Sequence, residues 1–349
     1  MKEICFIIDS IKGSGGRERV ISLLANEFVQ ENRVEILILD NCEESFYELD
    51  KRIKKIPLRS NGKIDMLKKL HRILKVNEEK IYITLSMRLL NLFVGIASIN
   101  TKSKIIATEH CDYFTTPKLL RGMKRIFYKN FECVVTLTIK DRDIIKPWVK
   151  NCIQINNPCS FKSDIESSHE NNIILNIGRL TEQKGQDMLI DAWKLIDRKN
   201  WKLKIVGEGE LKGSFNKKIS ELSLDNSIEI IPPTKTIDKI YKSADFFVLS
   251  SRWEGLPMVL IEAMEFGLPC VSFDCETGPR QLIIDGKNGF LVEANNVEKL
   301  AEKINCLIED KEKIKKMAIE AKLKANEFKI ENIMPKWNEL IEKIKEGKK

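Results

Sequence analysis

The chain has 349 residues, which is long for one globular domain and favours two. Hydrophobic residues make up 43% of it, enough for sizeable cores, so the composition excludes an intrinsically disordered protein. No apolar run approaches about 18 residues, and the first, residues 4–8, is too short for a signal peptide. A soluble cytosolic protein is therefore expected. Nine cysteines without a C-x-x-C pair indicate reduced thiols rather than disulfides or zinc.

The net charge of +8 is concentrated in the first half of the chain. Residues 1–160 carry 28 Lys and Arg against 19 Asp and Glu, whereas residues 161–349 carry 31 against 32. A basic half suggests an anionic partner, such as a membrane surface, a lipid-linked phosphate or a nucleic acid. A solvated lysine-rich surface explains the charge equally well. A nucleic acid is the least expected partner, because the basic residues lack interleaved aromatics.

The first half alternates short apolar runs with amphipathic segments, which predicts a parallel, doubly wound sheet. Strands are expected at residues 3–11, 34–39, 82–85, 104–108, 133–137 and 153–155. Glycines at positions 13, 15 and 16 follow the first strand and open a helix. Their spacing is neither G-x-G-x-x-G nor a P-loop. Such a loop allows a ligand to approach the backbone, although it can also simply form a tight turn.

Residues 118–129 are predicted to form a basic amphipathic helix. Its mostly apolar side consists of Leu119, Leu120, Met123, Ile126 and Phe127. This side could lie on an anionic bilayer. The cationic contacts would then be Lys118, Arg121, Lys124 and Arg125. Packing of the apolar side against the sheet is the alternative.

The polar stretch at residues 162–172 is expected to link two domains. The pattern then restarts, with strands at 172–177, 201–206, 228–231, 246–249 and 270–273 and a helix at 187–196. This predicts a second doubly wound sheet. In such sheets ligands bind beyond the carboxyl ends of the strands, so two of them would face each other across one cleft. From residue 297 the chain is expected to be helical, with Trp337 and Leu340 as packing residues.

Loops of distinctive composition follow the strands of the second half. Residues 178–185 carry Arg179 and Lys184 ahead of a helix, an arrangement suited to binding two phosphates. Gly207-Glu208-Gly209 forms a turn that lets a flat group approach the backbone, and Pro232-Pro233 follows the next strand. All of these loops should line the same edge of the sheet.

The stretch from Ser251 to Met264 combines a loop with a helix N-terminus. The helix is expected to begin near Pro257, since proline is tolerated at that position. Its free amides and positive dipole end would lie over a crevice. Glu254 in the loop and Glu262 in the helix add two carboxylates, which suit a ligand with many hydroxyls.

These motifs together resemble the family 4 retaining glycosyltransferases of the GT-B fold, over nearly the whole chain. The motifs are Gly15-Gly16-Arg17-Glu18-Arg19, Gly178-Arg179…Lys184-Gly185, Val206-Gly207-Glu208-Gly209 and Glu254-x7-Glu262. The resemblance implies an α/β protein of two Rossmann-like domains facing each other across a cleft. Residues 1–160 would bind the acceptor and residues 161–330 the nucleotide sugar. Residues 331–349 would form a helix that returns to the first domain.

The resemblance also assigns roles in donor binding. Arg179 and Lys184 should grip the donor diphosphate and stabilise the charge that grows on it. Glu262 should accept hydrogen bonds from ribose hydroxyls, and Glu254 should hold the donor sugar. The expected catalytic residues are His110, Arg179, Lys184 and Glu254.

Other donor contacts are implied by the same resemblance. The amides of Gly255, Leu256 and Met258 should lie near sugar hydroxyls or phosphate, whereas Pro257 offers no N–H. Gly15 and Gly16 should let the first loop approach the donor phosphate and the acceptor, and His110 matches a histidine that relatives place near the sugar. The remaining donor-binding positions are Gly207 and Pro233, the latter standing where many relatives carry glycine.

The activity implied is that of a retaining hexosyltransferase that uses a nucleotide sugar, with UDP as the expected nucleotide. It would extend a lipid-linked or saccharide acceptor in cell-surface glycan biosynthesis, in the cytoplasm or peripherally on the inner face of the membrane. No cofactor and no metal are expected, because Arg179 and Lys184 supply positive charge and capping explains the D-x-D sequence at residues 141–143. Alternatives are a nucleotide-sugar 2-epimerase of the same fold and a non-catalytic nucleotide-sugar-binding protein.

Overall fold

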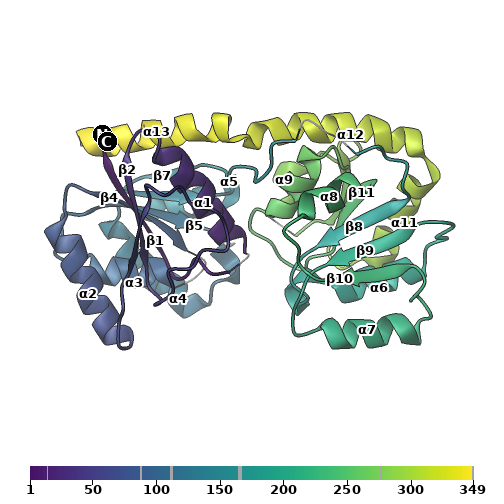
Figure 1. Ribbon diagram of the computed structural model, residues 1–349, viewed down its shortest axis with the longest axis horizontal. Helices are drawn as coiled ribbons and strands as arrows, with labels where there is room; N and C mark the ends of the chain where they lie inside the picture. The colour runs from purple at the N-terminus through teal and green to yellow at the C-terminus, as the bar shows by residue number, and fades with distance from the viewer. Residues whose placement is uncertain (14, 87–88, 111–112, 164–166, 276, 348–349) are drawn as a thin grey trace. The chain divides into compact units, whose positions relative to one another are not determined.

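The computed structural model describes residues 1–13, 15–86, 89–110, 113–163, 167–275 and 277–347. The chain divides into two compact units. Unit 1 comprises Met1–Ser160 and Ile330–Lys349, and unit 2 comprises Phe161–Lys329. Each unit is built on one parallel sheet flanked by helices (Figure 1). The predicted fold class of two Rossmann-like α/β domains is confirmed.

Unit 1 contains a seven-stranded parallel sheet in the order β3-β2-β1-β4-β5-β6-β7. Its strands are β1 (Glu3–Ile8), β2 (Arg33–Ile38), β3 (Lys54–Pro57), β4 (Ile81–Ser86), β5 (Lys104–Glu109), β6 (Cys133–Thr136) and β7 (Cys152–Gln154). Its helices are α1 (Gly16–Phe28), α2 (Lys63–Val76), α3 (Leu90–Ala97), α4 (Lys118–Phe127), α5 (Ile139–Ile145) and α13 (Ile330–Glu346). The strand order reverses between β1 and β4, and ligands of such sheets bind at this reversal.

The strands β1, β2, β4, β5, β6 and β7 lie where apolar runs predict them. β3 is not predicted, because its sequence Lys54-Lys55-Ile56-Pro57 includes two exposed lysines and a proline. Proline fits only at an edge or an end of a sheet. β3 is one of the two edge strands of the sheet, so this composition agrees with its place.

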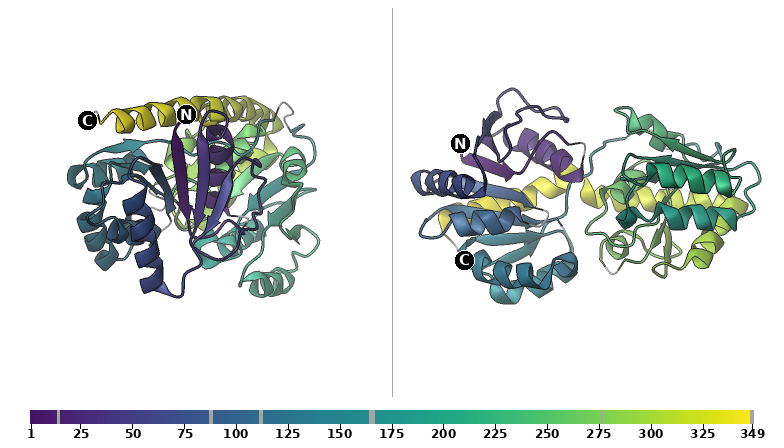
Figure 2. Two further views of the ribbon diagram at one scale, coloured as in Figure 1. Left: turned by 60° about the vertical axis from the view of Figure 1, so that its left-hand side comes forward. Right: turned by 90° about the horizontal axis from the view of Figure 1, so that it is seen from below.

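Helix α13 packs in unit 1, far in sequence from the rest of that unit (Figures 1 and 2). The ring of Trp337 meets Phe28 of α1 edge-on, with centroids 6.4 Å apart. Lys2 forms an ion pair with Glu342 near the C-terminal end of α13. Trp337 and Leu340 are both buried, as predicted.

Helix α4 departs from the prediction at Lys124. This residue was expected to face a membrane, but it is 1% exposed and its ammonium lies 2.8 Å from the carboxylate of Glu109. Lys124 lies one turn before Tyr128, which is fully buried against the sheet. The membrane prediction is therefore wrong for Lys124, because the carboxylate at the end of β5 draws this lysine into the interior.

Arg121 on the same helix is also engaged within unit 1. Its guanidinium lies over the rings of Tyr113 and Phe114, 5.5 and 5.6 Å from their centroids. The exposed face of α4 retains Lys118 and Arg125 of the predicted cations. Leu119 and Ile126 lie on that face too, 76% and 65% exposed.

Unit 2 contains a six-stranded parallel sheet in the order β10-β9-β8-β11-β12-β13. Its strands are β8 (Ile173–Ile177), β9 (Lys202–Val206), β10 (Ile228–Ile231), β11 (Phe246–Leu249), β12 (Cys270–Phe273) and β13 (Gly289–Val292). Its helices are α6 (Gln186–Lys194), α7 (Lys212–Glu221), α8 (Ile237–Lys242), α9 (Met258–Glu265), α10 (Pro279–Leu282), α11 (Val297–Glu309) and α12 (Lys311–Ala325). The order reverses between β8 and β11. β13 is the strand that the sequence does not predict.

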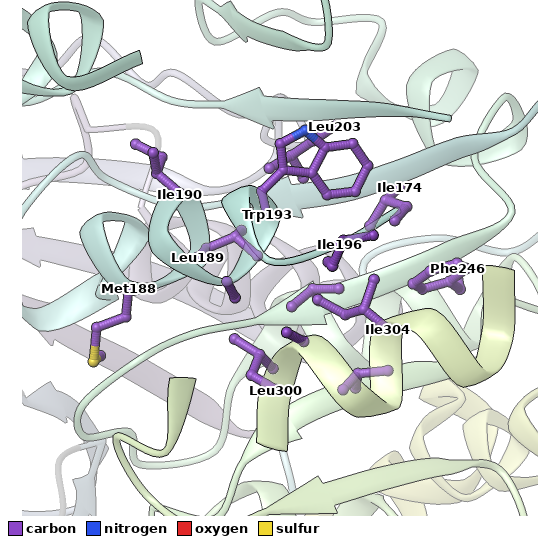
Figure 3. Packing of buried hydrophobic residues seen from close by; sticks show 14 of the residues in the cluster. Ile174, Met188, Leu189, Ile190, Trp193, Ile196, Leu203, Phe246, Leu300 and Ile304 are labelled. Atoms are coloured by element: carbon purple, nitrogen blue, oxygen red, sulfur yellow. The ribbon is translucent and has the colours of Figure 1, made fainter. Parts of the chain in front are cut away.

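The core of unit 2 is built around Trp193 of α6, which is fully buried (Figure 3). It packs in one cluster with Leu203 of β9 and, on α11, Leu300 and Ile304. The indole N–H donates to the hydroxyl oxygen of Ser227 at 3.1 Å, so the buried polar atom is satisfied.

The polar stretch at residues 162–172 is not a free linker. Within its described part, the Ser167 hydroxyl donates to the carbonyl of Ala244, and His169 Nδ1 lies 2.9 Å from the carbonyl of Asp245. Both residues are buried. The stretch therefore packs as part of unit 2, through hydrogen bonds to a distant loop that its polar composition does not indicate.

The cysteines of the described residues are all free, and most of them are buried. This agrees with the predicted reduced thiols. No helix in the described ranges is long and apolar enough to cross a membrane.

Replacing Trp193 with alanine should destabilise unit 2 by about 3–5 kcal/mol, because the surrounding core cannot refill a cavity of that size. Lys194→Ala is the matched control, since that neighbouring side chain is exposed and its loss should cost less than about 0.5 kcal/mol. Urea unfolding followed by circular dichroism measures both. Equal stability losses in the two variants would contradict this account of the core.

Candidate active site

The candidate site in unit 2 lies where the strand order reverses. β8 and β11 are neighbours in the sheet, and the loop after each strand contributes one charged residue. Lys184 follows β8 and Glu254 follows β11, and Lys184 Nζ lies 2.7 Å from Glu254 Oε1. Both side chains are largely buried. The structure thus brings together two of the predicted catalytic residues, at the position where doubly wound sheets bind ligands.

The loop that carries Lys184 is held close to the β11 loop by Gly185. This glycine has φ of +62°, a backbone conformation that side chains rarely adopt. A Cβ atom there would also penetrate the carbonyl oxygen of Ser250. The Ser250 hydroxyl donates to the carbonyl of Lys184 at 3.0 Å. Backbone contact between the loops therefore sets the position of the lysine.

Glu254 is fixed by neighbours besides Lys184. The Ser251 hydroxyl donates to Glu254 Oε1 at 2.6 Å, and the Thr277 hydroxyl donates to the backbone carbonyl of Glu254. Cys275 lies against the same loop, with Sγ 3.0 Å from the carbonyl of Ser251. Burial and the charge of Glu254 raise the pKa of Cys275 to about 12. This thiol therefore stays protonated and does not serve as a nucleophile.

An ion pair that the sequence does not reveal joins the loop after β11 to the start of α6. Arg252 forms two hydrogen bonds with the carboxylate of Asp187, at 2.9 and 2.7 Å. It also donates to the carbonyl of Glu182 at 2.7 Å. Although burial acts in the opposite direction, the hydrogen bonds from Arg252 lower the pKa of Asp187. The two residues are 65 positions apart, so only the fold shows the pairing.

Helix α9 begins after the Glu254 loop. Gly255, Leu256 and Pro257 lead into it, and Met258 is its first residue. No side chain caps this helix and its first turn holds no acidic residue. The amides of the first turn therefore keep their capacity to bind an anion or a hydroxyl oxygen.

Glu262 lies further along α9 and is 4% exposed. Its Oε2 accepts a hydrogen bond from the hydroxyl of Tyr241 at 2.9 Å. The Tyr241 ring stacks on Phe266, with centroids 5.1 Å apart and planes 9° from parallel. The carboxylate is thus oriented by an aromatic support that the sequence motif does not include.

The other predicted donor-binding residues lie at the same edge of the sheet. Arg179 is exposed and shares the post-β8 loop with Lys184, while Pro233 is exposed after β10. Gly207 differs, because it is buried and a Cβ there would penetrate the carbonyl oxygen of Gly178. The close approach at Gly207 is therefore between two loops of the protein itself.

In unit 1, Gly15 and Gly16 are exposed at the start of α1, beyond the end of β1. The carboxylate of Glu18 folds back over Gly15, where it would meet an added Cβ. Arg17 Nη1 donates to Asp9 at 2.9 Å and to the carbonyl of Leu85 at 3.3 Å. Because two carboxylates flank one guanidinium, this loop suits a ligand with hydroxyls better than a phosphate.

His110 follows the end of β5 and is partly exposed. Its Nε2 lies 2.9 Å from the hydroxyl oxygen of Thr108, and its backbone N–H donates to Ser86. Burial and the nearby charge of Arg17 lower the pKa of His110 to about 3. The imidazole is therefore neutral at physiological pH.

A buried polar network beside His110 is missing from the sequence predictions. Glu109 accepts from Lys124 at 2.8 Å, from Asn91 at 2.9 Å and from the Tyr128 hydroxyl. All four side chains are buried. A lysine at this depth is exceptional unless it is paired, and the pairing becomes visible only once β5 and α4 are in place.

The described residues contain no cluster of three or more His, Cys, Asp or Glu that could hold a metal ion. In the D-x-D sequence, Asp141 accepts from the amide of Tyr113 at 3.0 Å and from the hydroxyl of Thr138 at 2.5 Å. Thr138 in turn caps α5 by accepting from the amide of Asp141. The cap of α5 is therefore Thr138, and the carboxylate of Asp141 supports this cap without capping the helix itself.

Comparison with known proteins gives a consistent set of relatives. Residues 160–324 match the family described as Glycosyl transferases group 1. The chain is 32% identical to the amylovoran biosynthesis glycosyltransferase AmsD of Erwinia amylovora, over 98% of this chain and 100% of that protein. It is 30% identical, over 99% of both chains, to a Campylobacter jejuni alpha-1,4-N-acetyl-D-galactosaminyltransferase whose name gives a diNAcBac-PP-undecaprenol saccharide as substrate.

Solved structures agree in fold. A mutant of S. aureus TarM in complex with fondaparinux, alpha-GlcNAc-glycerol and UDP is similar with a TM-score of 0.81 at 18% identity, over 97% of this chain and 99% of that chain. Sucrose-phosphate synthase from Thermosynechococcus elongatus is similar with a TM-score of 0.80 at 17% identity, over 99% of each chain.

Gly185→Ala should lower the free energy of unfolding of unit 2 by about 1–3 kcal/mol, because alanine must adopt a positive φ and displace the Ser250 carbonyl. Gly213→Ala is the control, since nothing lies within 4 Å of a Cβ added there and the residue is in helix α7. Gly213→Ala should raise the free energy of unfolding by about 0.5–1 kcal/mol. Urea unfolding measures both, and a Gly185 variant as stable as the parent would contradict the proposed loop contact.

Proposed function

Because the chain belongs to the group 1 glycosyltransferases, we propose that it is a retaining, metal-independent hexosyltransferase that uses a UDP-sugar. Its acceptor is a lipid-linked saccharide or another saccharide in cell-surface glycan biosynthesis. The named relatives support this assignment, since one acts in amylovoran biosynthesis and another on an undecaprenol-linked saccharide. A nucleotide-sugar 2-epimerase is disfavoured by the same relatives.

The observation that carries the proposal is the Lys184–Glu254 pair at the β8/β11 reversal, next to the uncapped start of α9. Lysine has three N–H donors, so Lys184 can bind a phosphate oxygen while it keeps its bond to Glu254. The exposed guanidinium of Arg179 supplies a second cation from the same loop. The amides at the start of α9 add dipoles of the same sign. A diphosphate fits this set of donors.

Charge on the diphosphate grows during sugar transfer, and the site favours that change. The acceptor oxygen forms a bond to the anomeric carbon while the bond from that carbon to the diphosphate breaks. The acceptor proton passes to the leaving phosphate oxygen on the same face, so configuration is retained. Lys184 and Arg179 stabilise the departing diphosphate electrostatically, which removes the need for a metal ion.

The two carboxylates have separate tasks in this proposal. Glu262 is held by Tyr241 and accepts hydrogen bonds from the ribose hydroxyls. Glu254 accepts from the hydroxyls of the donor sugar, in reach of the loop at Gly255 and Leu256. Glu254 does not act as a nucleophile, because its carboxylate already accepts hydrogen bonds from Lys184 and Ser251.

Lys184→Ala should lower kcat about 100-fold or more, because it removes a charge that stabilises the transition state. Activity is measured by screening UDP-sugars for hydrolysis and then for transfer to lipid-linked saccharides, with and without EDTA. Lys217→Ala is the control, as this lysine is exposed on α7, and it should behave like wild type. Glu262→Ala should instead weaken UDP binding. Wild-type turnover in Lys184→Ala would refute the phosphate role.

The same assay separates the alternatives. NMR of the product shows whether the anomeric configuration of the donor is retained. An epimerase would convert the donor sugar without any acceptor, and a binding protein would retain UDP without consuming the sugar. Loss of transfer in EDTA would contradict metal independence.

We also propose that the exposed face of α4 contacts an anionic membrane, in a form that the structure corrects. Lys124 is buried and is therefore not part of the predicted contact, whereas Lys118 and Arg125 of α4 and Lys129, two residues beyond its end, are exposed. Lys118 and Arg125 share the exposed face of α4 with Leu119 and Ile126, which lie two turns apart on the helix. Alternating cations and exposed apolar side chains suit a helix that lies in the headgroup region.

Neutralising Lys118, Arg125 and Lys129 to glutamine should weaken binding to phosphatidylglycerol vesicles about 100-fold, at about 1 kcal/mol per charge. The control replaces three exposed lysines of unit 2, namely Lys194, Lys217 and Lys239. Sedimentation with vesicles measures both variants at two salt concentrations. Equal binding by the two triple variants would show that α4 is not the contact.

A further inference from the structure

The hydrogen-bond partners of the three histidines define which ring nitrogen carries the proton. His71 Nδ1 lies 2.8 Å from the carbonyl oxygen of Ala97, and His169 Nδ1 lies 2.9 Å from that of Asp245. A carbonyl oxygen only accepts, so both histidines donate from Nδ1. His110 differs from both, because its contact is made by Nε2 and its partner is a hydroxyl.

The hydroxyl of Thr108 has only one proton, and that proton is already used. Thr108 Oγ1 lies 2.6 Å from the carbonyl oxygen of Thr84, which can only accept. Thr108 must therefore donate to Thr84, and it can only accept from His110. It follows that Nε2 of His110 carries a proton. The neutral imidazole described above holds one ring proton, so Nδ1 carries the lone pair.

The position of the Thr108 hydroxyl is fixed by a buried frame. Asn91 Nδ2 donates to the backbone carbonyl of Thr108 at 3.0 Å, and Asn91 Oδ1 accepts from the Thr84 hydroxyl. The three side chains are buried. Satisfied buried networks of this kind hold their members in one arrangement.

The charged groups around His110 do not compete with Thr108 for the proton on Nε2. Glu109 points to the other face of the strand, where Lys124 neutralises it at 2.8 Å. Arg17 is the charge that acts on the imidazole, and it is itself paired with Asp9 at 2.9 Å. No carboxylate in the described part of the chain is bonded to the ring of His110.

We propose that Thr108 is a positioning residue that holds His110 as the Nε2–H tautomer, so that Nδ1 accepts a hydrogen bond from a substrate hydroxyl. The proposal rests on the function proposed above. A nitrogen lone pair binds a hydroxyl, which donates, but not a phosphate oxygen, which only accepts. His110 therefore recognises a sugar hydroxyl, rather than a phosphate oxygen, at the carboxyl ends of β4 and β5.

The tautomer can be measured without turnover. In a protein with ¹⁵N-labelled histidine, ring-nitrogen NMR should show a protonated Nε2 and an unprotonated Nδ1 for one residue. His110→Asn identifies that signal, because it should disappear in the variant. The neutral pattern should persist down to about pH 5, since the pKa of His110 is lowered to about 3. A proton on Nδ1 of His110 would overturn the proposal.

Substitution of Thr108 tests the positioning role. Thr108→Val keeps the shape but removes the acceptor, so the Nε2–H resonance should broaden through exchange with water and kcat/KM should fall about tenfold. Thr108→Ser keeps the hydroxyl and should restore both. UDP affinity should stay within about twofold in all three proteins. An unchanged Nε2–H resonance and unchanged kinetics in Thr108→Val would refute the role, as would a failure of serine to rescue a folded enzyme.

The two amide substitutions of His110 provide a second measurement that does not depend on the stability of the Thr108 variants. Asparagine can place an acceptor near the position of Nδ1, whereas glutamine reaches the position of Nε2. His110→Asn should therefore retain at least about tenfold more activity than His110→Gln. The reverse order would contradict acceptance at Nδ1. If no donor and acceptor pair supports transfer by wild type, the proposed function fails while the NMR result stands.

Discussion

The candidate site depends on the contact between Lys184 and Glu254. The pair connects the loops after β8 and β11 and is largely buried, so neither charge is fully solvated. A buried ion pair is weak support for stability, because desolvation offsets much of the attraction. The ion pair instead fixes the positions of the two side chains, since removing either partner would leave the other charge uncompensated at the reversal of the sheet. The Ser250 and Arg252 contacts hold these two loops together, while Ser251 fixes Glu254 within its own loop.

Unit 1 has a comparable pair in Glu109 and Lys124, but its surroundings give it a different task. Lys184 is partly accessible to a ligand, whereas Lys124 is 1% exposed. The carboxylate of Glu109 also accepts hydrogen bonds from Asn91 and Tyr128. The unit 1 pair therefore cannot bind substrate. It fixes the end of β5, and therefore the positions of Thr108 and Glu109, which precede His110. The unit 2 pair remains accessible within the candidate site, whereas the unit 1 pair is a buried structural support.

The sequence predicts those parts of the fold that local patterns determine. Buried parallel strands such as Phe246–Leu249 are continuous apolar runs, and the loops that follow them carry the charged and glycine residues of the site. The sequence does not predict β3, because two lysines and a proline are not a strand pattern by themselves. They fit an edge strand only when the neighbouring strand is in place. The sequence predicts an exposed Lys124, since a lysine is buried only beside a partner and Glu109 is fifteen positions away. The sequence also does not predict the contacts Asp187–Arg252 and Tyr241–Glu262, because the partners are far apart in the chain. Local pattern identifies the candidate site residues, whereas the residues that support them are brought into place by tertiary contacts.

The polar groups of the two candidate sites differ in the direction of their hydrogen bonds. Around Lys184 the available groups are donors, namely the lysine, Arg179 and the uncapped amides of α9, and donors bind the oxygens of a phosphate. In unit 1 the guanidinium of Arg17 is already paired with Asp9, and Thr108 leaves the imidazole of His110 with a lone pair at Nδ1, so an acceptor is available there. Acceptors bind hydroxyls. A glycosyl transfer needs both kinds of surface, because the leaving group is an anion and the sugar and its acceptor are polyols.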